Sequence, residues 1–238
     1  MITLLRPPAD LDRAEVELEG DAYRHLFRAR RAAAGERVRL ADGAGRARWG
    51  EVVSVGRSAA TVRVGGEAPA NLPAARVHLL VGAPKKERTS WLVEKATELG
   101  VAAVRFLDTA RTPREFGDGT VRRLARVAAA ALEQSHGSRL PELTGTHPFA
   151  EVPELLAAAP SARYLLDTGE PAAGGAPLVL DPSPPPAATA VLVGPEGGWS
   201  DAEREALAAL ACRPISLGPT TLRTETAALA AAALLLAR

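Results

Sequence analysis

"VLVGPEGGWSDAERE", residues 191–205, joins an apolar run to a helix start through a glycine-rich loop. The apolar, β-branched residues before Gly194 predict a buried strand. Ser200 and Glu203 have the spacing of a reciprocal capping pair, so a helix is expected to begin there. Glycine permits a close backbone approach and Pro195 stiffens the loop. The stretch is either an ordinary connection from strand to helix or a loop that presents its backbone to a ligand.

"SLGPTTLRTETAALAA", residues 216–231, repeats this order further along the chain. A strand is expected to end at Leu217, Gly218 and Pro219 turn the chain, and a helix is expected to begin near Thr224. Ligands of parallel α/β sheets bind at the carboxyl ends of the strands. We therefore expect the two loops to form two walls of one pocket.

The other residues after position 75 also alternate between strand and helix patterns. Strands are predicted at 77–81, 101–107, 164–167, 189–193 and 215–217, and helices at 89–99, 120–134, from 200 and from 224. Such alternation is typical of a parallel sheet covered by helices. The predicted fold class of this part is α/β.

The residues before position 70 show a different pattern. "ERVRLADGAGRARWGEVVSVGRSAATVRV", residues 36–64, has short apolar runs separated by turn signals at 42–45 and 56–58. This predicts a compact set of short antiparallel strands, preceded by a short helix at 21–31. Residues 65–75 are rich in Gly, Pro and Ala and are interpreted as a linker. The predicted domains are 1–68 and 75–238.

The composition excludes several classes of protein. The 238 residues are 47% hydrophobic and 24% charged, with no uninterrupted apolar run of membrane-spanning length. Charges and prolines in residues 1–10 differ from the apolar core of a signal peptide, so a cytoplasmic protein is expected. A single cysteine, Cys212, excludes an internal disulfide, and the four histidines lack metal-ligand spacing, so no metal is expected.

The charge is unevenly distributed although the net charge is only +1. Between positions 23 and 48, eight arginines face only two acids, Glu36 and Asp42. These arginines are Arg24, Arg28, Arg30, Arg31, Arg37, Arg39, Arg46 and Arg48. The local excess suits contacts with phosphate groups. It also fits a chain with a general preference for Arg and Ala, and the pattern alone leaves both interpretations open.

The common nucleotide-binding and nucleophile motifs are missing from the sequence. It contains no G-x-G-x-x-G opening the α/β part, no G-x-x-x-x-G-K-[ST] and no G-x-S-x-G. Cys212 has no histidine close in sequence, so covalent catalysis is not expected. The two glycine-proline loops remain as the chemistry-bearing features.

Six segments together resemble the RsmE-type family of the SPOUT class, whose members methylate N3 of a uridine in small-subunit ribosomal RNA with S-adenosylmethionine. The segments are "HLFRARR" (25–31), "LADG" (40–43), "KATELGV" (95–101), "ALEQS" (131–135), "VGPEGGWS" (193–200) and "LGPTTLRTETAAL" (217–229). The resemblance implies a PUA-like β-barrel followed by a parallel-sheet SPOUT domain with a deep trefoil knot. It also implies a homodimer that acts on 16S ribosomal RNA or the assembled small ribosomal subunit.

The resemblance implies a cofactor site made from the two loops and the end of a third strand. Its residues would be Leu166, Gly194, Pro195, Glu196, Gly197, Gly198, Leu217, Gly218, Leu222 and Thr226. Catalysis would involve Glu225 as the base that removes the uracil N3 proton, with Glu196 as the alternative base. Arg223 would stabilise the developing uracil anion or hold a phosphate.

The resemblance also implies RNA-binding residues in both parts of the chain. They are His25, Arg28, Arg31, Lys85, Arg88 and Arg111, with Lys86, Gln134 and Arg139 as further candidates. Two positions depart from the family pattern: Arg30 replaces an apolar residue, and Ala110 replaces an acid that often precedes the arginine at 111. Any ion pair that depended on that acid is therefore not expected here.

Three alternatives to uridine N3 methylation remain open at the level of the sequence. Knotted methyltransferases also modify ribose 2′-hydroxyls, so the methylated atom can differ. A protein that binds RNA without turnover could retain the fold, although both loops are intact. The Gly-Pro-Glu-Gly-Gly loop could also serve another nucleotide.

Overall fold

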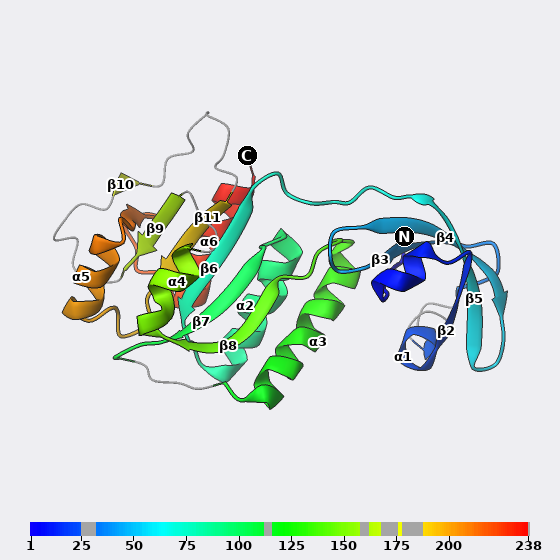
Figure 1. Ribbon diagram of the computed structural model, residues 1–238, viewed down its shortest axis with the longest axis horizontal. Helices are drawn as coiled ribbons and strands as arrows, with labels where there is room; N and C mark the ends of the chain where they lie inside the picture. The colour runs from blue at the N-terminus through cyan, green and yellow to red at the C-terminus, as the bar shows by residue number, and fades with distance from the viewer. Residues whose placement is uncertain (25–31, 112–115, 158–161, 168–175, 178–187, 238) are drawn as a thin grey trace. The chain divides into compact units, whose positions relative to one another are not determined.

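The computed structural model describes residues 1–24, 32–111, 116–157, 162–167, 176–177 and 188–237. By its internal contacts the chain divides into two compact units, both drawn in Figure 1. The first unit contains residues 1–72 and 129–140, and the second contains residues 73–128 and 141–238. The domain limits 1–68 and 75–238 stay a prediction.

The first unit is built on a five-stranded sheet with the strand order β1-β3-β4-β5-β2. The strands are β1 (Thr3–Leu5), β2 (Glu15–Glu19), β3 (Arg37–Ala41), β4 (Ala47–Val55) and β5 (Ala59–Glu67). The short helices η1 (Pro8–Asp12) and α1 (Gly20–Tyr23) complete this unit before β3. β1 pairs with β3 in parallel, and the other neighbours are antiparallel, as the alternating pattern predicts.

Side-chain alternation explains these strands, and the structure corrects one expectation about where they end. In β2 the even positions Val16 and Leu18 are buried and their neighbours are exposed. The linker predicted at 65–75 begins later, because β5 continues to Glu67 and its Gly65 carbonyl accepts a hydrogen bond from Arg48 at 2.8 Å. The helix predicted at 21–31 overlaps α1, while residues 25–31 lie outside the described residues.

Arg39 differs from the exposed arginine that the basic segment suggests. It is 1% exposed and donates hydrogen bonds of 2.8 Å to the carbonyls of Pro69 and Gly137, and a further one to the Ser138 hydroxyl. Burial lowers the pKa of its guanidinium. Arg39 therefore ties the sheet to residues 137–138 of the same unit and is not available to phosphate.

The second unit is a seven-stranded sheet with the order β10-β12-β9-β11-β6-β7-β8. The strands are β6 (Arg76–Gly82), β7 (Ala103–Asp108), β8 (Glu142–Pro148), β9 (Ala162–Leu166), β10 (Ala176–Pro177), β11 (Ala188–Val193) and β12 (Arg213–Ser216). All neighbouring strands are parallel, which confirms the predicted α/β class. The knot that the resemblance implies stays a prediction.

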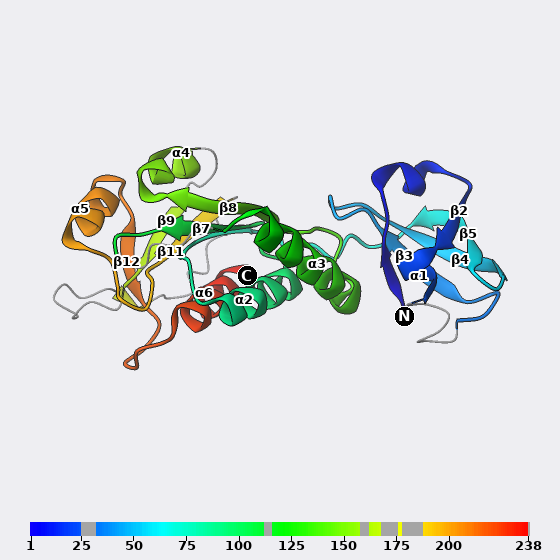
Figure 2. The same ribbon diagram turned by 90° about the horizontal axis from the view of Figure 1, so that it is seen from below.

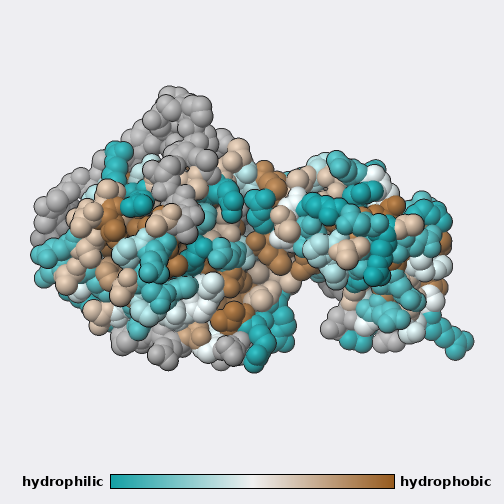
Figure 3. Space-filling view, viewed as in Figure 1, coloured by the Kyte–Doolittle hydropathy of each residue, from teal (hydrophilic) through white to brown (hydrophobic). Residues whose placement is uncertain are grey.

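Helices cover both faces of this sheet. They are α2 (Lys86–Leu99), α3 (Asp118–Ser135), the turn η3 (Phe149–Glu151), α4 (Val152–Ala157), α5 (Asp201–Ala209) and α6 (Thr224–Leu236). In Figure 2, α4 and α5 lie on one face, and α2 and α6 lie on the other. Figure 3 shows how side chains of different hydropathy are distributed over one side of the chain. Among the described residues, no helix is both long enough and apolar enough to cross a membrane.

The helix signals of the sequence are largely confirmed. Ser200 and Glu203 form the predicted capping box, and α2 ends at Gly100, whose left-handed backbone (φ 80°) closes the helix. β8 was not predicted. Its residues between the two ends are all half-buried, so neither an apolar run nor a clear alternation marks it.

Candidate active site

The chain order of the second sheet reverses at β6. β7 lies on one side of β6, and β11, which comes much later in the sequence, lies on the other. Ligands of open α/β sheets bind where the strand order reverses, outside the carboxyl ends of the strands. The segments that follow β6, β11 and β12 carry most of the predicted site residues, so their contacts decide whether one site is formed.

The loop after β11 packs directly against the end of β6. A Cβ atom added to Gly82 would lie 2.7 Å from both the backbone nitrogen and Cδ of Pro195. No side chain fits at that distance, so glycine is required for the loop to approach the strand. Pro195 is buried, whereas Glu196 and Gly197 are exposed at the tip of the loop.

The glycine-rich loop is held in one shape by its own hydrogen bonds and by Leu166 at the end of β9. The Gly198 N–H donates to the Pro195 carbonyl at 2.8 Å, with Gly198 in the left-handed region at φ 69°. The Leu166 carbonyl accepts bonds of 3.3 Å from the Gly194 N–H and from the indole N–H of the fully buried Trp199. Thus the loop is preorganised before any ligand arrives.

The start of α6 joins this loop through Thr224. Its hydroxyl donates to the Gly194 carbonyl at 2.9 Å, and the side chain is buried. The two glycine-proline loops that the sequence placed at one pocket are therefore linked at this point. Thr224 was not predicted as a site residue, because a threonine at the first position of a helix is common without any such role.

Arg88 of α2 connects the two predicted carboxylates. Its Nη1 donates to Glu196 Oε1 at 2.7 Å, and its Nε lies 3.5 Å from Glu225 Oε1. The Arg88 side chain is 28% exposed, so these contacts are only partly screened by water. Arg88 bridges the loop after β11 and the start of α6. Its predicted role in RNA binding stays a prediction.

Glu225 has one oxygen engaged and one oxygen free. The residue is 6% exposed and lies in the first turn of α6, where the helix dipole favours a negative charge. Oε1 faces Arg88, while Oε2 is buried and, within the described residues, accepts no hydrogen bond. A buried carboxylate oxygen without a donor is costly, and a ligand N–H would satisfy it.

Arg111, after β7, adds a contact from the other side of β6. Its Nη1 donates to the Gly197 carbonyl at 2.8 Å, and a Cβ on Gly197 would lie 3.3 Å from the Cβ of Arg111. Ala110 contributes through its backbone, because its N–H donates to Glu203 Oε1 at 2.9 Å. Position 110, which lacks an acidic side chain, thus contacts α5 through its backbone N–H.

The remaining predicted residues lie around the same strand ends. Leu217 and Leu222 are half-buried, and Gly218, Arg223 and Thr226 are exposed. Arg223 is the N-cap residue of α6, directly beside the residues that contact Gly194 and Arg88. Lys85 is exposed at the N-cap of α2. The binding and catalytic roles of these residues stay predictions.

Three predicted RNA-binding residues, His25, Arg28 and Arg31, lie outside the described residues. Gln134 and Arg139 lie in the first unit, where Gln134 is exposed and Arg139 is half-buried. In the described part of the chain, no group of three or more His, Cys, Asp or Glu side chains is arranged to hold a metal ion.

Comparison with protein families gives two matches, one to the β-rich N-terminal region and one to the α/β region that follows it. The family model described as an RNA methyltransferase PUA domain matches residues 18–65, and the model described as an RNA methyltransferase domain matches residues 70–236. The second match covers more than half of the chain. The first identifies the β-rich N-terminal region as PUA-like, as the resemblance implied.

Several curated relatives, two of which follow, carry the description ribosomal RNA small subunit methyltransferase E. The protein from Mycobacterium bovis is 33% identical over 228 residues, which cover 89% of this chain and 82% of the relative. The protein from Bacillus subtilis is 30% identical over 166 residues, covering 65% of this chain and 62% of the relative, which is less than two thirds of its length.

A solved structure supports the same assignment. It belongs to a protein from Legionella pneumophila described as a methyltransferase in complex with the cofactor SAM. The two chains are 27% identical and superpose with a TM-score of 0.80, covering 99% of this chain and 96% of the other. With the family matches and the mycobacterial relative, this places the chain: it belongs to the RNA methyltransferase family of the ribosomal RNA small subunit methyltransferases E.

Proposed function

We propose that this protein transfers a methyl group from S-adenosylmethionine to N3 of a uridine in small-subunit ribosomal RNA. The observation that carries the proposal is the buried Glu225 oxygen that lacks a donor, placed beside the glycine-rich loop at the reversal of the sheet. The names of the curated relatives supply the class of RNA, and the structure from Legionella pneumophila supplies the cofactor.

The two loops fit a bound S-adenosylmethionine, which supplies an activated methyl group on a sulfonium. The loop from Gly194 to Gly198 is held by hydrogen bonds and presents backbone groups at an exposed tip. Leu217 and Leu222 offer half-buried apolar side chains next to the exposed backbone of Gly218. Backbone donors and acceptors for the adenine edge, with apolar walls around them, are what such a ligand requires.

Glu225 would act as the proton acceptor. The N3 nitrogen forms its bond to carbon as the methyl group leaves the sulfonium, and the N3 proton passes to a carboxylate oxygen. Oε2 of Glu225 is the described carboxylate oxygen at this site that is both buried and free, whereas Glu196 is engaged by Arg88 at 2.7 Å and partly exposed. This contrast favours Glu225 over Glu196 as the base.

Arg88 and Arg223 would have different tasks. Arg88 would fix the relative position of the Glu196 loop and the Glu225 carboxylate, and so act as a positioning residue. Arg223 is exposed beside Glu225 and would stabilise negative charge on a uracil oxygen or hold a phosphate. Lys85 and Arg111, with His25, Arg28 and Arg31, would contact the RNA backbone.

The proposal includes a homodimer in the cytoplasm, with residues 1–68 as an RNA-binding domain and residues 75–238 as a knotted catalytic domain. Light scattering of the purified protein tests the dimer, and a monomer would remove it from the proposal. Limited proteolysis tests the boundary, because cleavage is expected between positions 68 and 75.

Mass-spectrometric mapping of ribosomal RNA, with and without the gene, tests the reaction. We expect one uridine that carries an N3 methyl only when the gene is present, and restoration of that methyl when purified protein and labelled S-adenosylmethionine are added to deficient small subunits. A methyl group found on a ribose 2′-oxygen would show that the ribose, and not uridine N3, is the methylated position. If the protein bound RNA but transferred no methyl group, it would be an RNA-binding protein and the proposed enzymatic activity would be wrong.

A further inference from the structure

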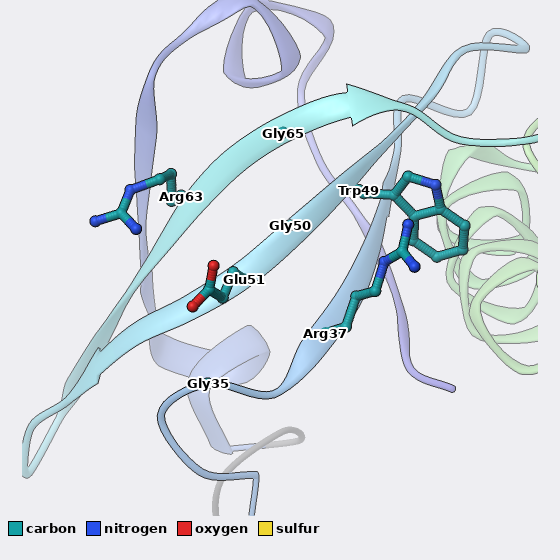
Figure 4. A pocket seen from close by; sticks show the side chains of 7 residues that line it. All are labelled: Gly35, Arg37, Trp49, Gly50, Glu51, Arg63 and Gly65. Carbon is teal, nitrogen blue, oxygen red and sulfur yellow. The ribbon is translucent and has the colours of Figure 1, made fainter.

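A hollow of about 350 Å³ lies on the first unit, whereas the loops of the candidate active site belong to the second unit (Figure 4). Four side chains and three glycines line it. The side chains are Arg37, Trp49, Glu51 and Arg63, and the glycines are Gly35, Gly50 and Gly65. Its volume falls in the range of pockets that hold small ligands or single nucleotides.

The sheet register brings the four side chains onto one face. Arg37 of β3 lies opposite Glu51 of β4, and Glu51 lies opposite Arg63 of β5. Trp49 is two residues before Glu51 on β4, so its side chain points to the same side of the sheet. Gly50 between them faces the core, where a Cβ would lie 2.6 Å from Val62.

Arg37 stacks on Trp49. Its guanidinium carbon lies 3.7 Å from the centre of the indole ring, and the indole is half-buried. Figure 4 shows the guanidinium beside the ring, while Glu51 extends from the same strand as Trp49 and Arg63 from the next strand. A guanidinium and an indole in contact form a planar, polarisable surface of the kind on which nucleobases stack.

The glycines leave this surface accessible. No heavy atom lies within 4 Å of a Cβ added to Gly35, and a Cβ on Gly65 would lie 3.4 Å from the Trp49 carbonyl, in ordinary contact. Gly65 therefore keeps the strand beside Trp49 free of a side chain although one would fit. Glu51 offers acceptors for base N–H groups. Arg63 is 55% exposed and its Nε lies 3.4 Å from Glu15 Oε1, so its other guanidinium nitrogens can donate to phosphate or carbonyl oxygens.

We propose that this hollow binds one unpaired nucleobase of a single-stranded segment in the RNA substrate, with the base extending the stack that Arg37 forms on Trp49. The inference rests on the proposed function for the identity of the partner as RNA. It assigns base recognition to strands β3, β4 and β5, where the sequence offered arginines only as part of a basic segment suited to phosphate contacts. Unpaired bases are the usual target of aromatic side chains in RNA recognition.

The test is the affinity of the full-length protein for a short, unstructured RNA oligonucleotide, measured by fluorescence anisotropy at fixed salt. Trp49→Ala should raise the Kd about tenfold, within the range found for loss of one base stack. Trp49→Phe should restore most of the affinity. Trp91→Ala is the matched control, because Trp91 is 44% exposed on α2 of the second unit and should leave the Kd unchanged.

The dependence on salt separates stacking from charge. Trp49→Ala should leave the slope of log Kd against log salt unchanged, since no phosphate contact is lost. Arg63→Ala should lower the slope. An unaltered Kd in Trp49→Ala, or an equal loss in Trp91→Ala, would overturn the inference. The inference would also be overturned if Trp49→Ala bound the oligonucleotide normally but no longer bound small ribosomal subunits, because the hollow would then contact a ribosomal protein.

The result is distinguishable from failure of the proposed function. If the wild-type protein methylates no uridine but its RNA affinity depends on Trp49, the hollow binds a base and the proposed reaction is wrong. If the wild-type protein methylates the uridine and Trp49→Ala binds RNA as tightly, the reaction stands and the hollow is not a base site. Thermal unfolding of each variant confirms that the fold is retained.

Discussion

Glu225 combines three properties that a proton acceptor needs. It is buried, its Oε1 is held by Arg88 at 3.5 Å, and its Oε2 has no donor within the described residues. A carboxylate that only complements the helix dipole can do so from an exposed position, where water satisfies its oxygens. The free oxygen is therefore the feature that separates a catalytic interpretation from a purely structural one.

Replacement of Glu225 by glutamine tests this residue. The amide retains the size of the side chain but cannot accept the N3 proton, so we expect kcat to fall about 100-fold or more. The Kd for S-adenosylmethionine should change less than about threefold, because Arg88 keeps its contact with Glu196. Single-turnover methylation of small subunits and isothermal titration measure the two quantities.

The control is Glu196→Gln, at the exposed tip of the loop. It should lower kcat less than Glu225→Gln does, because its carboxylate is already engaged by Arg88. The reverse order of the two effects would make Glu196 the base. Wild-type turnover in both variants would remove general-base catalysis by either carboxylate.

Gly82 makes a second prediction at this scale. An added Cβ would lie 2.7 Å from backbone and ring atoms of Pro195, so Gly82→Ala must push the loop away from the strand. We expect a loss of about 1–3 kcal/mol in the free energy of unfolding. The affinity for S-adenosylmethionine should fall at least about tenfold, because the loop shape is part of the proposed site.

Gly119→Ala is the matched control for this substitution. A Cβ at Gly119, near the start of α3, would meet no heavy atom within 4 Å. Its stability and cofactor affinity should equal those of the wild type or exceed them slightly, since alanine favours helix. Cofactor affinity that is unchanged in Gly82→Ala would mean that the loop does not contact the cofactor.

At the scale of elements, one polar row ties three neighbouring strands together. Arg105 of β7 contacts His78 Nδ1 of β6 at 3.2 Å and donates to Glu142 Oε2 of β8 at 2.7 Å. A guanidinium can only donate, so Nδ1 accepts and His78 is neutral. Burial, followed by the charges of Arg105 and Arg76, lowers the pKa of His78, while Glu142 opposes this effect.

The neutral His78 predicts how stability depends on pH. In the unfolded chain His78 binds a proton near its ordinary pKa of 6.5, whereas in the folded protein its pKa is lower. The contribution of His78 is thus complete above pH 6.5 and is lost as the pH falls below it, with a slope of at most about 1.4 kcal/mol per pH unit. Urea unfolding at pH 7.5 and 5.5 should show this loss.

His78→Asn isolates this contribution from the other histidines. The asparagine oxygen can occupy the place of Nδ1 and accept from Arg105, but it does not titrate. The variant should therefore lose less stability than the wild type between pH 7.5 and pH 5.5. Equal losses in the two proteins would show that His78 does not carry the dependence.

At the scale of the whole molecule, the sequence predicted those features of the fold that depend on residues close together in the chain. The capping pair Ser200 and Glu203 and the end of α2 at Gly100 are local signals, and the structure confirms both. It also predicted the order of a β-rich region and an α/β region, because the side-chain period changes from two residues to a helical period between them.

The contacts that could not be predicted from the sequence join residues far apart in the chain. Arg88 meets Glu196 across 108 positions, and a basic residue at the start of a helix gives no sign of such partners. Arg39 was part of a basic segment, yet its place under residues 137–138 depends on a segment almost 100 positions later. Sequence periodicity carries no information on pairings at this range.

Ligand linkage is the prediction that involves the whole molecule. The proposed cofactor site draws on Leu166, on the loop from Gly194 to Gly198 and on residues 217–226, which only the folded sheet brings together. Because the unfolded chain lacks the site, S-adenosylmethionine at 100 times its Kd should add about 2.7 kcal/mol to the free energy of unfolding. Chemical denaturation with and without the ligand measures this.

The same denaturation experiment with ATP, and with the variants Glu225→Gln and Gly82→Ala, shows which ligand the loop binds. If the Gly-Pro-Glu-Gly-Gly loop serves the cofactor, S-adenosylmethionine stabilises the wild type and Glu225→Gln equally, Gly82→Ala responds only at higher concentration, and ATP has little effect. Stabilisation by ATP with displacement of S-adenosylmethionine would instead assign the loop to another nucleotide. This measurement tests cofactor binding alone, because stabilisation by a ligand requires neither RNA nor turnover. If the protein is stabilised by S-adenosylmethionine but methylates no RNA, its loops bind the methyl donor, and the defect lies in RNA binding or in the methyl transfer itself.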